Sequence, residues 1–480
     1  MADVRVVRAE RAWIDGGFRP AQVRIVDGVI AEVTPLSAAA GADAAASDDL
    51  IVLRSDEVLL PGLVDSHVHL DEPGRTEWEG FATGTAAAAA GGITTLFDMP
   101  LNSVPVTTTP AALAAKRAAA AGTLAVDIGY WGGAVPENLG SLRALADAGV
   151  VGFKCFLVPS GIDEFGHLDA AGVRAALTEL AVFDGLLIAH AEDEGHLHEA
   201  AVEVGAGPAG ELGRHYETFL RSRPPISEEA AIAAVIAAAR ETGGRAHIVH
   251  VADGRALDAI RAAKAEGIRL TIETCPHYLT LAAEDVPDGA SAFKCCPPIR
   301  DRANQDLLWA GVVDGTIDAI VSDHSPATLA LKTAGGGDFG LAWGGIAGVQ
   351  TGFASVWTEA ARRGIPLESL LPLFTTGPAR IAGMPGLGVI IPGARANLTV
   401  FAPEREWTVD AHRLLYRHKL SPWDGHVLRG AVVTTVVGGT VVYRAGDDDA
   451  RARPGVELLA GAGVGAGAGA GVTIREGARS

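Results

Sequence analysis

The chain has 480 residues, 48% of them hydrophobic, and carries 39 basic against 58 acidic side chains, for a formal net charge of −19. This length is enough for one large barrel with an appendage, or for two or three smaller domains. A surface this acidic repels phosphate backbones and anionic lipid headgroups, so binding to nucleic acid or to a membrane surface is not expected. No run of 18 or more apolar residues occurs, and no transmembrane helix is expected either.

The N-terminal residues and the cysteines point to a compartment. The first 18 residues mix charges with alternating valines and lack the apolar core of a signal peptide. The four cysteines (Cys155, Cys275, Cys295 and Cys296) form no C-x-x-C pair and are too few for a disulfide scaffold. We therefore expect a protein of the reducing cytoplasm.

Both ends of the folded chain have the sequence pattern of short strands. Residues 4–17 and 21–35 alternate apolar and polar side chains between glycine turns, and the same pattern returns at 396–404 and 430–446. We predict that residues 1–58 and 385–455 meet as a small β-sandwich domain, although a whole barrel separates them in the sequence.

Between these ends the pattern changes to short apolar runs, most of them followed by an alanine-rich amphipathic segment. Helical character is clear at 77–91, 227–243 and 254–267. The apolar runs are residues 62–70, 94–100, 124–132, 151–157, 186–193, 247–253, 269–277 and 319–326. Eight buried strands alternating with helices predict an α/β fold, a closed (β/α)₈ TIM-like barrel over residues 59–384.

A doubly wound open sheet is the competing fold. It usually has fewer strands and a glycine-rich phosphate turn. The sequence has no G-x-G-x-x-G after its first predicted barrel strand and no G-x-x-x-x-G-K-[ST] motif. The barrel is the better prediction.

Three stretches are predicted to be loops or tails. Residues 37–49 and 333–340 are rich in alanine, glycine and small polar residues. Residues 460–472 are almost entirely glycine and alanine, which offer little apolar area to compensate for ordering. We expect residues 456–480 to form a flexible tail.

Polar side chains able to bind metal stand at the C-terminal ends of several apolar runs, where the active sites of barrel enzymes lie. They are His67, His69, Lys154, His190, His250 and Asp323. Side chains two apart on a strand point to the same side, so His67 and His69 offer two nitrogen ligands to one cation. An isolated H-x-H motif is weak, with structural and ligand roles about equally favoured.

The other members of this set have ordinary interpretations when taken one at a time. A single histidine after a buried run, such as His190 or His250, is more often a hydrogen-bonded core residue. His247, three residues before His250, is expected to point to the opposite face and to be structural. A lone lysine such as Lys154 more often extends to the surface, the alternative being an amine carboxylated by CO₂ that bridges two cations. A buried Asp323 is costly unless it is paired or metal-bound. Together the residues favour a two-metal site that holds a hydroxide.

Five sequence blocks carry a resemblance to a known family. Residues 61–81, 97–108, 152–165, 273–279 and 322–326 resemble the cyclic amidohydrolases, and within them most closely the allantoinases. The likeness runs from about residue 50 to residue 439, and its blocks are long and in order.

The resemblance implies a binuclear metal centre, usually zinc. His67 and His69 would bind one metal together with Asp323, and His190 and His250 would bind the other. Lys154, as N6-carboxylysine, would bridge the two. Asp323 would also be the general base for attack by the metal-bridging hydroxide. The family likeness further suggests a homotetramer acting on a small-molecule cyclic ureide.

Two positions distinguish branches of the family. Dihydroorotases usually have an arginine directly after H-x-H-L, whereas this chain has Asp71. Hydantoinases and dihydropyrimidinases have a tyrosine five residues after the bridging lysine, where this chain has Pro159. Both positions match allantoinases, which implies opening of allantoin to allantoate. One departure is Ala327, where allantoinases commonly have cysteine after the SDHSP block, which puts the metal preference in question.

Other functions stay open. Hydantoinase or dihydropyrimidinase activity on other five- or six-membered cyclic ureides is the first alternative, dihydroorotase is a further one, and a non-catalytic scaffold homologue belongs to a different class. The scaffold is disfavoured because all six ligand positions carry suitable residues.

Substrate contacts are predicted only loosely. Arg75 and Asn102 lie on loops after the first two barrel strands, and either a substrate contact or loop stabilisation accounts for them. His277 follows the seventh strand and either faces the pocket or braces its loop. Glycines 335–337 allow large backbone changes and are compatible with a lid, although a plain surface loop is the default.

Overall fold

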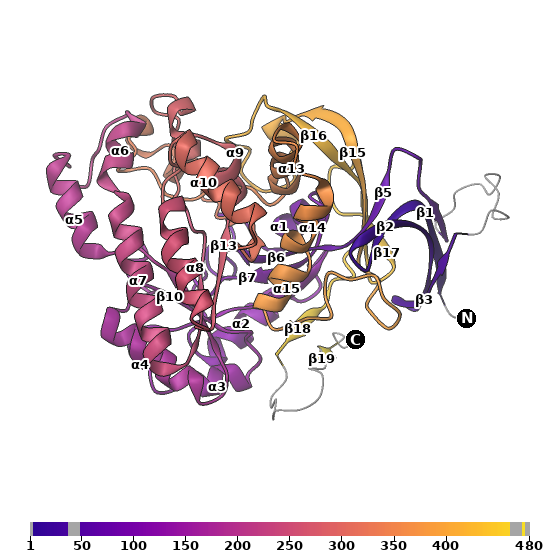
Figure 1. Cartoon of the computed structure of the whole chain (residues 1–480), viewed down its shortest axis with the longest axis horizontal. Coiled ribbons are helices and arrows are strands. Elements are labelled where there is room, and N and C mark those ends of the chain that lie inside the picture. The colour runs from indigo at the N-terminus through magenta and orange to yellow at the C-terminus, as the bar shows by residue number, and fades with distance from the viewer. Residues whose placement is uncertain (1–2, 37–48, 461–472, 476–480) are drawn as a thin grey trace.

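The structure is a computed structural model of the chain and describes residues 3–36, 49–460 and 473–475 (Figure 1). Most of the predicted loop at 37–49 and most of the glycine- and alanine-rich segment at 460–472 lie outside the described residues. Within the described ranges, no helix combines the length and the apolar character needed to cross a membrane.

The centre of the molecule is a closed barrel of parallel strands, as the sequence predicts. Within the described residues the barrel strands are β6 (Leu63–Val68), β7 (Ile93–Asp98), β8 (Asp127–Tyr130) with β9 (Gly132–Gly133), β10 (Phe153–Phe156), β11 (Leu186–His190), β12 (Arg245–Ile248), β13 (Leu270–Thr274) and β14 (Ala319–Ile320). Each pairs in parallel with its neighbour. A parallel bridge between Val68 and His324 closes the ring, and the His69 N–H donates to the His324 carbonyl at 2.7 Å.

β8 and β9 act as one barrel strand interrupted at Trp131. β8 pairs with β7, and β9 pairs with β10, so the two pieces join the halves of the ring. The Trp131 indole donates to the Ser66 carbonyl at 2.9 Å, which ties this point to β6. All eight predicted strand positions are thereby confirmed.

Helices follow most of the barrel strands and cover the outside of the ring (Figure 1). The predicted helical segments at 77–91, 227–243 and 254–267 correspond to α1, α7 and α8. The helices are α1 (Phe81–Ala90), α2 (Pro110–Ala120), α3 (Leu142–Asp147), α4 (Ala170–Ala181), α5 (Glu194–Glu203), α6 (Tyr216–Ser222), α7 (Pro225–Thr242), α8 (Leu257–Ala265), α9 (Pro276–Thr280), α10 (Arg302–Val313), α11 (Leu329–Lys332), α12 (Ala334–Gly337), α13 (Gly352–Arg362), α14 (Leu367–Phe374) and α15 (Thr376–Ile381). Short 3-10 turns lie at Pro136–Asn138, Gly254–Ala256, Ala283–Asp285, Ser291–Phe293 and Ala411–Arg413.

Several of these helices begin at a residue whose side chain accepts a backbone N–H of the first turn. Thr109 caps α2, Asp169 caps α4 and Asp301 caps α10. Such caps satisfy donors that the helix itself leaves unpaired. They fix where each helix starts after its barrel loop.

Strands from both ends of the chain form one sheet beside the barrel, on the right in Figure 1. In the described part of the chain this sheet has eight strands in the order β17-β16-β15-β5-β1-β2-β3, with β4 paired to β1. They are β1 (Val4–Ile14), β2 (Gly17–Val26), β3 (Val29–Pro35), β4 (Leu50–Val52), β5 (Val58–Pro61), β15 (Leu398–Thr408), β16 (Val427–Val437) and β17 (Thr440–Arg444).

The two ends meet where β5 pairs antiparallel with β15. Side chains from both ends, including Val7, Val23, Leu398 and Val400, then share a separate hydrophobic core. The predicted union of the N- and C-terminal β segments is confirmed, while the exact domain limits stay a prediction.

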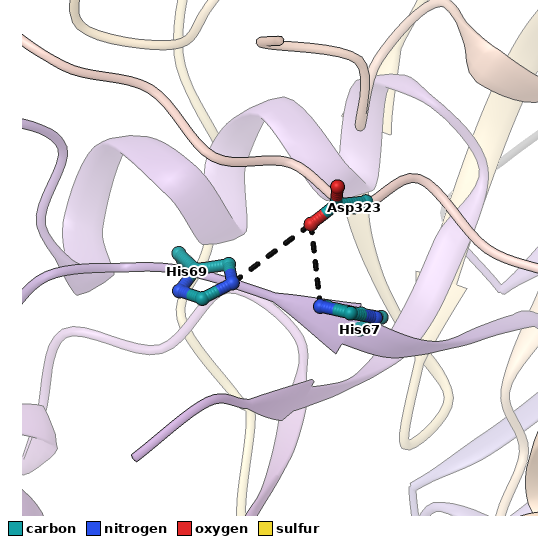
Figure 2. A group of neighbouring side chains, drawn as sticks. All are labelled: His67, His69 and Asp323. Carbon is teal, nitrogen blue, oxygen red and sulfur yellow. Dashed lines mark ion pairs between the residues drawn. The ribbon is translucent and has the colours of Figure 1, made fainter. Parts of the chain in front are cut away.

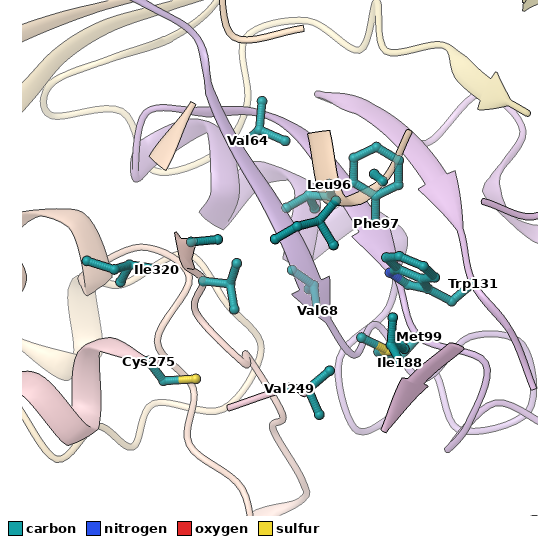
Figure 3. Packing of buried hydrophobic residues seen from close by; sticks show 14 of the residues in the cluster. Val64, Val68, Leu96, Phe97, Met99, Trp131, Ile188, Val249, Cys275 and Ile320 are labelled. Atoms are coloured by element: carbon teal, nitrogen blue, oxygen red, sulfur yellow. The ribbon is translucent and has the colours of Figure 1, made fainter. Parts of the chain in front are cut away.

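The main core fills the barrel and the space beneath its helices. Figure 3 shows part of it, with Val68 of β6, Leu96 of β7 and Ile188 of β11 among the packed side chains. This apolar layer underlies the polar side chains at the strand ends and separates them from bulk water.

The residues after 456 begin with a strand instead of a flexible tail. β18 (Glu457–Leu459) pairs with β8 in the barrel region, and β19 (Thr473–Arg475) pairs with β18. Leu458 is 1% exposed, and the Glu457 carboxylate accepts hydrogen bonds from Arg117 and Tyr130. The sequence pattern missed this strand because three residues carry too little periodicity to detect.

Candidate active site

The six predicted metal-competent side chains converge on one cavity of about 340 Å³ at the C-terminal ends of the barrel strands. Each is less than a tenth exposed. The set that lines this cavity together is His67, His69, Lys154, His190, His250 and Asp323. Six residues spread over 257 positions of the sequence therefore line the same cavity.

His67, His69 and Asp323 form the first group (Figure 2). The Asp323 Oδ1 atom lies 3.2 Å from His67 Nε2 and 3.8 Å from His69 Nε2. His67 lies within β6, which ends at Val68, and His69 directly follows the strand. The two rings point to the same side, as the spacing predicts (Figure 2).

His190 and His250 form the second group. His190 Nδ1 lies 3.0 Å from His250 Nε2, and the His190 ring stacks on Phe156 with its centroid 4.7 Å away. Lys154, on the neighbouring strand β10, has its Nζ atom 5.0 Å from the centroid of the same Phe156 ring. The lysine is 1% exposed and does not extend to the surface.

Burial sets the protonation of the imidazoles. It lowers the pKa of His67 to about 4, and it lowers the pKa of His69, His190 and His250 below the usual value for histidine. All four rings are therefore neutral at pH 7, which is the form that binds metal ions.

Burial shifts the pKa values of Lys154 and Asp323 in opposite directions, and each shift favours the neutral form of the group. It lowers the pKa of Lys154 to about 8, against the opposing attraction of Asp323 and Glu273. It raises the pKa of Asp323 to about 8, while Lys154 acts in the opposite direction. A positive charge between them would stabilise the Asp323 carboxylate and would lower the pKa of Lys154 further, favouring the neutral amine.

Behind the first group, Glu273 holds the outer nitrogen of His67. The Nδ1–H of His67 donates to Glu273 Oε1 at 2.5 Å, while the other carboxylate oxygen lies 3.1 Å from His247 Nε2. Although burial acts to raise it, the neighbouring His67 and His247 keep the pKa of Glu273 below its usual range. With Nδ1 protonated, the lone pair of His67 Nε2 faces Asp323 and the cavity.

The prediction that His247 points to the face opposite His250 is wrong, although His247 does not line the cavity among the described residues and its structural role stays a prediction. It assumed a regular strand from 247 to 250, but β12 ends at Ile248 and His250 has a φ of 39°. This left-handed residue turns the His250 ring into the same interior that His247 occupies. Asp323 likewise has a φ of 43°, and strained backbone of this kind gathers at functional sites.

Behind the second group, Glu192 holds the outer nitrogen of His190. His190 Nε2 lies 2.8 Å from Glu192 Oε2, and Arg223 pairs with both oxygens of the same carboxylate at 2.5 and 3.0 Å. Although burial acts to raise it, Arg223 and then His190 keep the pKa of Glu192 below its usual range. The ionised carboxylate fixes the His190 tautomer so that Nδ1 faces His250.

Glu273 and Glu192 were missed by the sequence analysis. Glu192 lies two residues after a predicted ligand in the run HAED, and Glu273 opens the block ETCPH. A carboxylate near a strand-end histidine was the only available signal, because the partner of Glu273 lies 206 positions away.

The predicted substrate contacts separate into two kinds. Among the described residues, Asn102 lines the cavity, and its side-chain amide lies 3.5 Å from His69 Nδ1. Arg75 does not line it: its guanidinium donates to the Asn102 carbonyl at 2.8 Å and pairs with Glu164 at 2.9 Å. His277 is fully buried outside the lining. For Arg75, the contacts are those of a residue that stabilises a loop.

Residues 340–345 form one wall of the cavity. They follow shortly after glycines 335–337, whose flexibility is compatible with a lid. Two buried lysines hold this wall through backbone carbonyls. Lys294 donates to Gly340 and Ala342, and Lys332 donates to Trp343, Gly345 and the Lys294 carbonyl. These contacts fasten the wall in the described conformation.

The positions that distinguish branches of the family differ in their relation to the cavity. Pro159 lines it and offers no hydroxyl to a substrate. Asp71 is fully buried with a φ of 63°, and Ala327 is 2% exposed; neither belongs to the lining among the described residues. Any effect of Ala327 on the site is therefore indirect, through a neighbouring loop.

The donor set fits divalent cations. His67 Nε2 is buried and has no hydrogen-bond partner, although a carboxylate oxygen lies 3.2 Å away. A cation between these two atoms would bind both, and it would displace the proton that the raised pKa of Asp323 keeps there in its absence. The ligand atoms of His67, His69 and Asp323 all lie within 4.8 Å of one another, and the nitrogen and oxygen donors suit zinc-like ions.

Comparison with known proteins places the chain in a family. A sequence model described as the amidohydrolase family matches residues 58–442. The chain belongs to the amidohydrolase family, and is therefore a hydrolase. Its barrel is also that of solved relatives: an L-hydantoinase (dihydropyrimidinase) from Arthrobacter aurescens superposes with a TM-score of 0.87 at 29% identity, covering 96% of this chain and 100% of that one.

The curated sequence relatives carry a narrower name. An allantoinase from Streptomyces avermitilis is 50% identical over 448 residues, which cover 93% of this chain and 97% of the relative. An allantoinase from Arabidopsis thaliana is 42% identical, covering 85% of this chain and 82% of the relative. The resemblance to cyclic amidohydrolases, and among them to allantoinases, is confirmed.

Replacement of Glu273 by glutamine tests its role in orienting His67. The neutral amide has one acceptor oxygen and lacks the negative charge that holds the His67 Nδ1–H, so we expect metal affinity to fall about 10- to 100-fold. The measurement is competition with a chelator, followed by metal analysis. Glu57→Gln is the matched control, since this buried carboxylate lies near the terminal sheet and should leave metal affinity unchanged. Equal metal affinity in Glu273→Gln and the native protein would contradict the role.

Proposed function

We propose that this protein hydrolyses the ring amide of allantoin to give allantoate, using two divalent metal ions, zinc in the first instance. The observation that carries the proposal is the convergence of six metal-competent side chains on one buried cavity. The 50% identity to an allantoinase over nearly the whole chain supports the choice of substrate.

In this proposal His67, His69 and Asp323 would hold one cation, and His190 and His250 would hold the other. Lys154, carboxylated on Nζ, would supply an anion shared by the two. This role is supported by its position, because the amine is 1% exposed and lines the same cavity as both groups. Burial at this site makes the charged ammonium costly. When bound, the cations lower the pKa of water and polarise the amide carbonyl.

The side chains of this protein then perform the proton transfers. Asp323 faces the cavity from the loop after β14, where it takes a proton from the attacking water and delivers it to the departing ring nitrogen. Glu273 and Glu192 keep the lone pairs of His67 and His190 directed inward throughout. Arg75, through the Asn102 carbonyl, fixes the loop that presents the Asn102 side chain to the substrate.

A second candidate is the hydrolysis of other cyclic ureides, because hydantoinases are among the structural relatives. Those relatives share 26 to 29% identity with this chain, against 50% for the bacterial allantoinase. Pro159 lines the cavity at the position where the family resemblance places a tyrosine in hydantoinases. Both facts favour allantoin.

We further propose a homotetramer in the cytoplasm whose only partner in the reaction is the small-molecule ureide. The support is the family likeness, the reduced cysteines (all four of them free) and the strongly acidic composition. Size-exclusion chromatography with light scattering tests the assembly.

A panel of four ring substrates tests the proposed activity. With allantoin, hydantoin, dihydrouracil and dihydroorotate we expect allantoin to give the highest kcat/KM, by about tenfold or more, equivalent to ~1.4 kcal/mol in the transition state. His67→Ala is the matched negative control and should lose metal together with ring opening. Full metal content and full activity in that variant would contradict the site, and a preference for hydantoin or dihydrouracil would establish the second candidate instead.

Replacement of Lys154 by alanine tests the carboxylated lysine. The variant should lose activity because the anion between the two metal groups is gone, and short-chain carboxylic acids should restore part of it by occupying the vacated space. Lys154→Arg fills that space without accepting CO₂, so it should be inactive and gain nothing from the acids. Wild-type metal content in Lys154→Ala without any rescue would count against carboxylation.

A further inference from the structure

His277 is a buried imidazole without a hydrogen-bond partner. Its ring is fully buried in α9, and neither Nδ1 nor Nε2 has a partner. Among the described residues its ring contacts Tyr278 edge-on, with centroids 4.2 Å apart. Buried polar atoms are nearly always satisfied, so an unpartnered pair of ring nitrogens points to a partner other than a protein side chain, namely a water molecule or an ion.

Two other metal-competent side chains stand beside this ring. Cys275 directly precedes α9 and is a fully buried free thiol. Its Sγ atom, a ring nitrogen of His277 and a carboxylate oxygen of Asp323 all lie within 4.8 Å of one another. A sulfur, a nitrogen and an oxygen donor at this spacing form a set that zinc and softer ions prefer.

We propose that Cys275, His277 and Asp323 form an additional cation site, adjoining the first metal group, that takes a thiophilic divalent ion such as Zn²⁺ in excess or Cd²⁺. The thiol donor separates it in chemistry from the catalytic set, which offers nitrogen and oxygen atoms. Ions that avoid sulfur, such as Mg²⁺, are not expected to bind there.

Binding at this site has two consequences. Cys275 coordinates as a thiolate, so each ion that binds releases one proton. Asp323 belongs to both ligand groups, and an ion held by Cys275 and His277 draws its carboxylate away from His67 and His69. Excess thiophilic metal therefore inhibits the enzyme. This inhibition rests on the proposed function, whereas the binding itself does not.

The route to the site runs through the substrate cavity. Asp323 lines that cavity, while Cys275 and His277 lie behind it and do not contribute to the lining in the described chain. The cavity also contains Cys296, which is partly exposed, and Cys295, which is buried. These thiols are the competing ligands that an experiment has to separate from Cys275.

Cadmium titration of the metal-loaded enzyme tests the proposal. We expect one cadmium ion per subunit to bind with a thiolate-to-cadmium charge-transfer band in the ultraviolet, while the metal already present is retained. Cys275→Ser should abolish the band and the additional ion, and His277→Gln should weaken binding about tenfold or more. Cys295→Ser and Cys296→Ser are matched thiol controls and should leave the band intact.

The outcomes are distinguishable from a failure of the proposed function, since the band and the metal count do not depend on which substrate is hydrolysed. A band that survives in Cys275→Ser but disappears in Cys296→Ser would overturn the assignment. So would release of the resident metal in step with cadmium uptake without a thiolate band. Circular dichroism of each variant confirms its fold, and His277→Gln provides a second test if Cys275→Ser does not fold.

Discussion

The burial of neutral imidazoles, an amine and a carboxylate in one small cavity is the constraint on which the site depends. Each group loses hydration there, and burial shifts the pKa of every one of them toward its uncharged form. Such a concentration of polar atoms is tolerable only if each finds a partner. The barrel supplies carboxylate partners for the outer nitrogens of His67 and His190 and leaves their inner nitrogens facing the cavity.

The division into outer and inner partners explains the arrangement of the surrounding residues. Glu273 and Glu192 stay ionised at full burial because each has cationic or hydrogen-bonding neighbours. Each carboxylate fixes one histidine tautomer, which a metal site needs before any ion arrives. The strand ends provide the rigid positions, and the left-handed residues His250 and Asp323 aim side chains that a regular strand would direct elsewhere.

The sequence was sufficient for the architecture and for the candidate ligands. Short apolar runs between helical segments located every barrel strand, because buried parallel strands have a strong local signature. The candidate ligands stood at the ends of those runs. The interactions that orient the ligands were not accessible in this way. Glu273 meets His67 across 206 positions, a contact that depends on closure of the ring. The early end of β12 and the positive φ of His250 changed the direction of His250 relative to His247. No local sequence pattern contains either feature.

His277 differs from these oriented histidines because neither of its ring nitrogens has a hydrogen-bond partner. In a site where the outer nitrogens of His67 and His190 have assigned acceptors, a ring with neither nitrogen satisfied needs an explanation of its own. Its position next to Cys275 and Asp323 links the loop after β13 to the general base of the proposed reaction. In our proposal, this loop connects catalysis to metal availability.

Anomalous X-ray diffraction at the absorption edge of the bound metal tests the central claim most directly. Our account predicts two peaks in each subunit, about 3.5–4 Å apart, one beside His67, His69 and Asp323 and the other beside His190 and His250, with additional density extending from Lys154 Nζ between them. A single peak, or two peaks with an unmodified amine at Lys154, would contradict it.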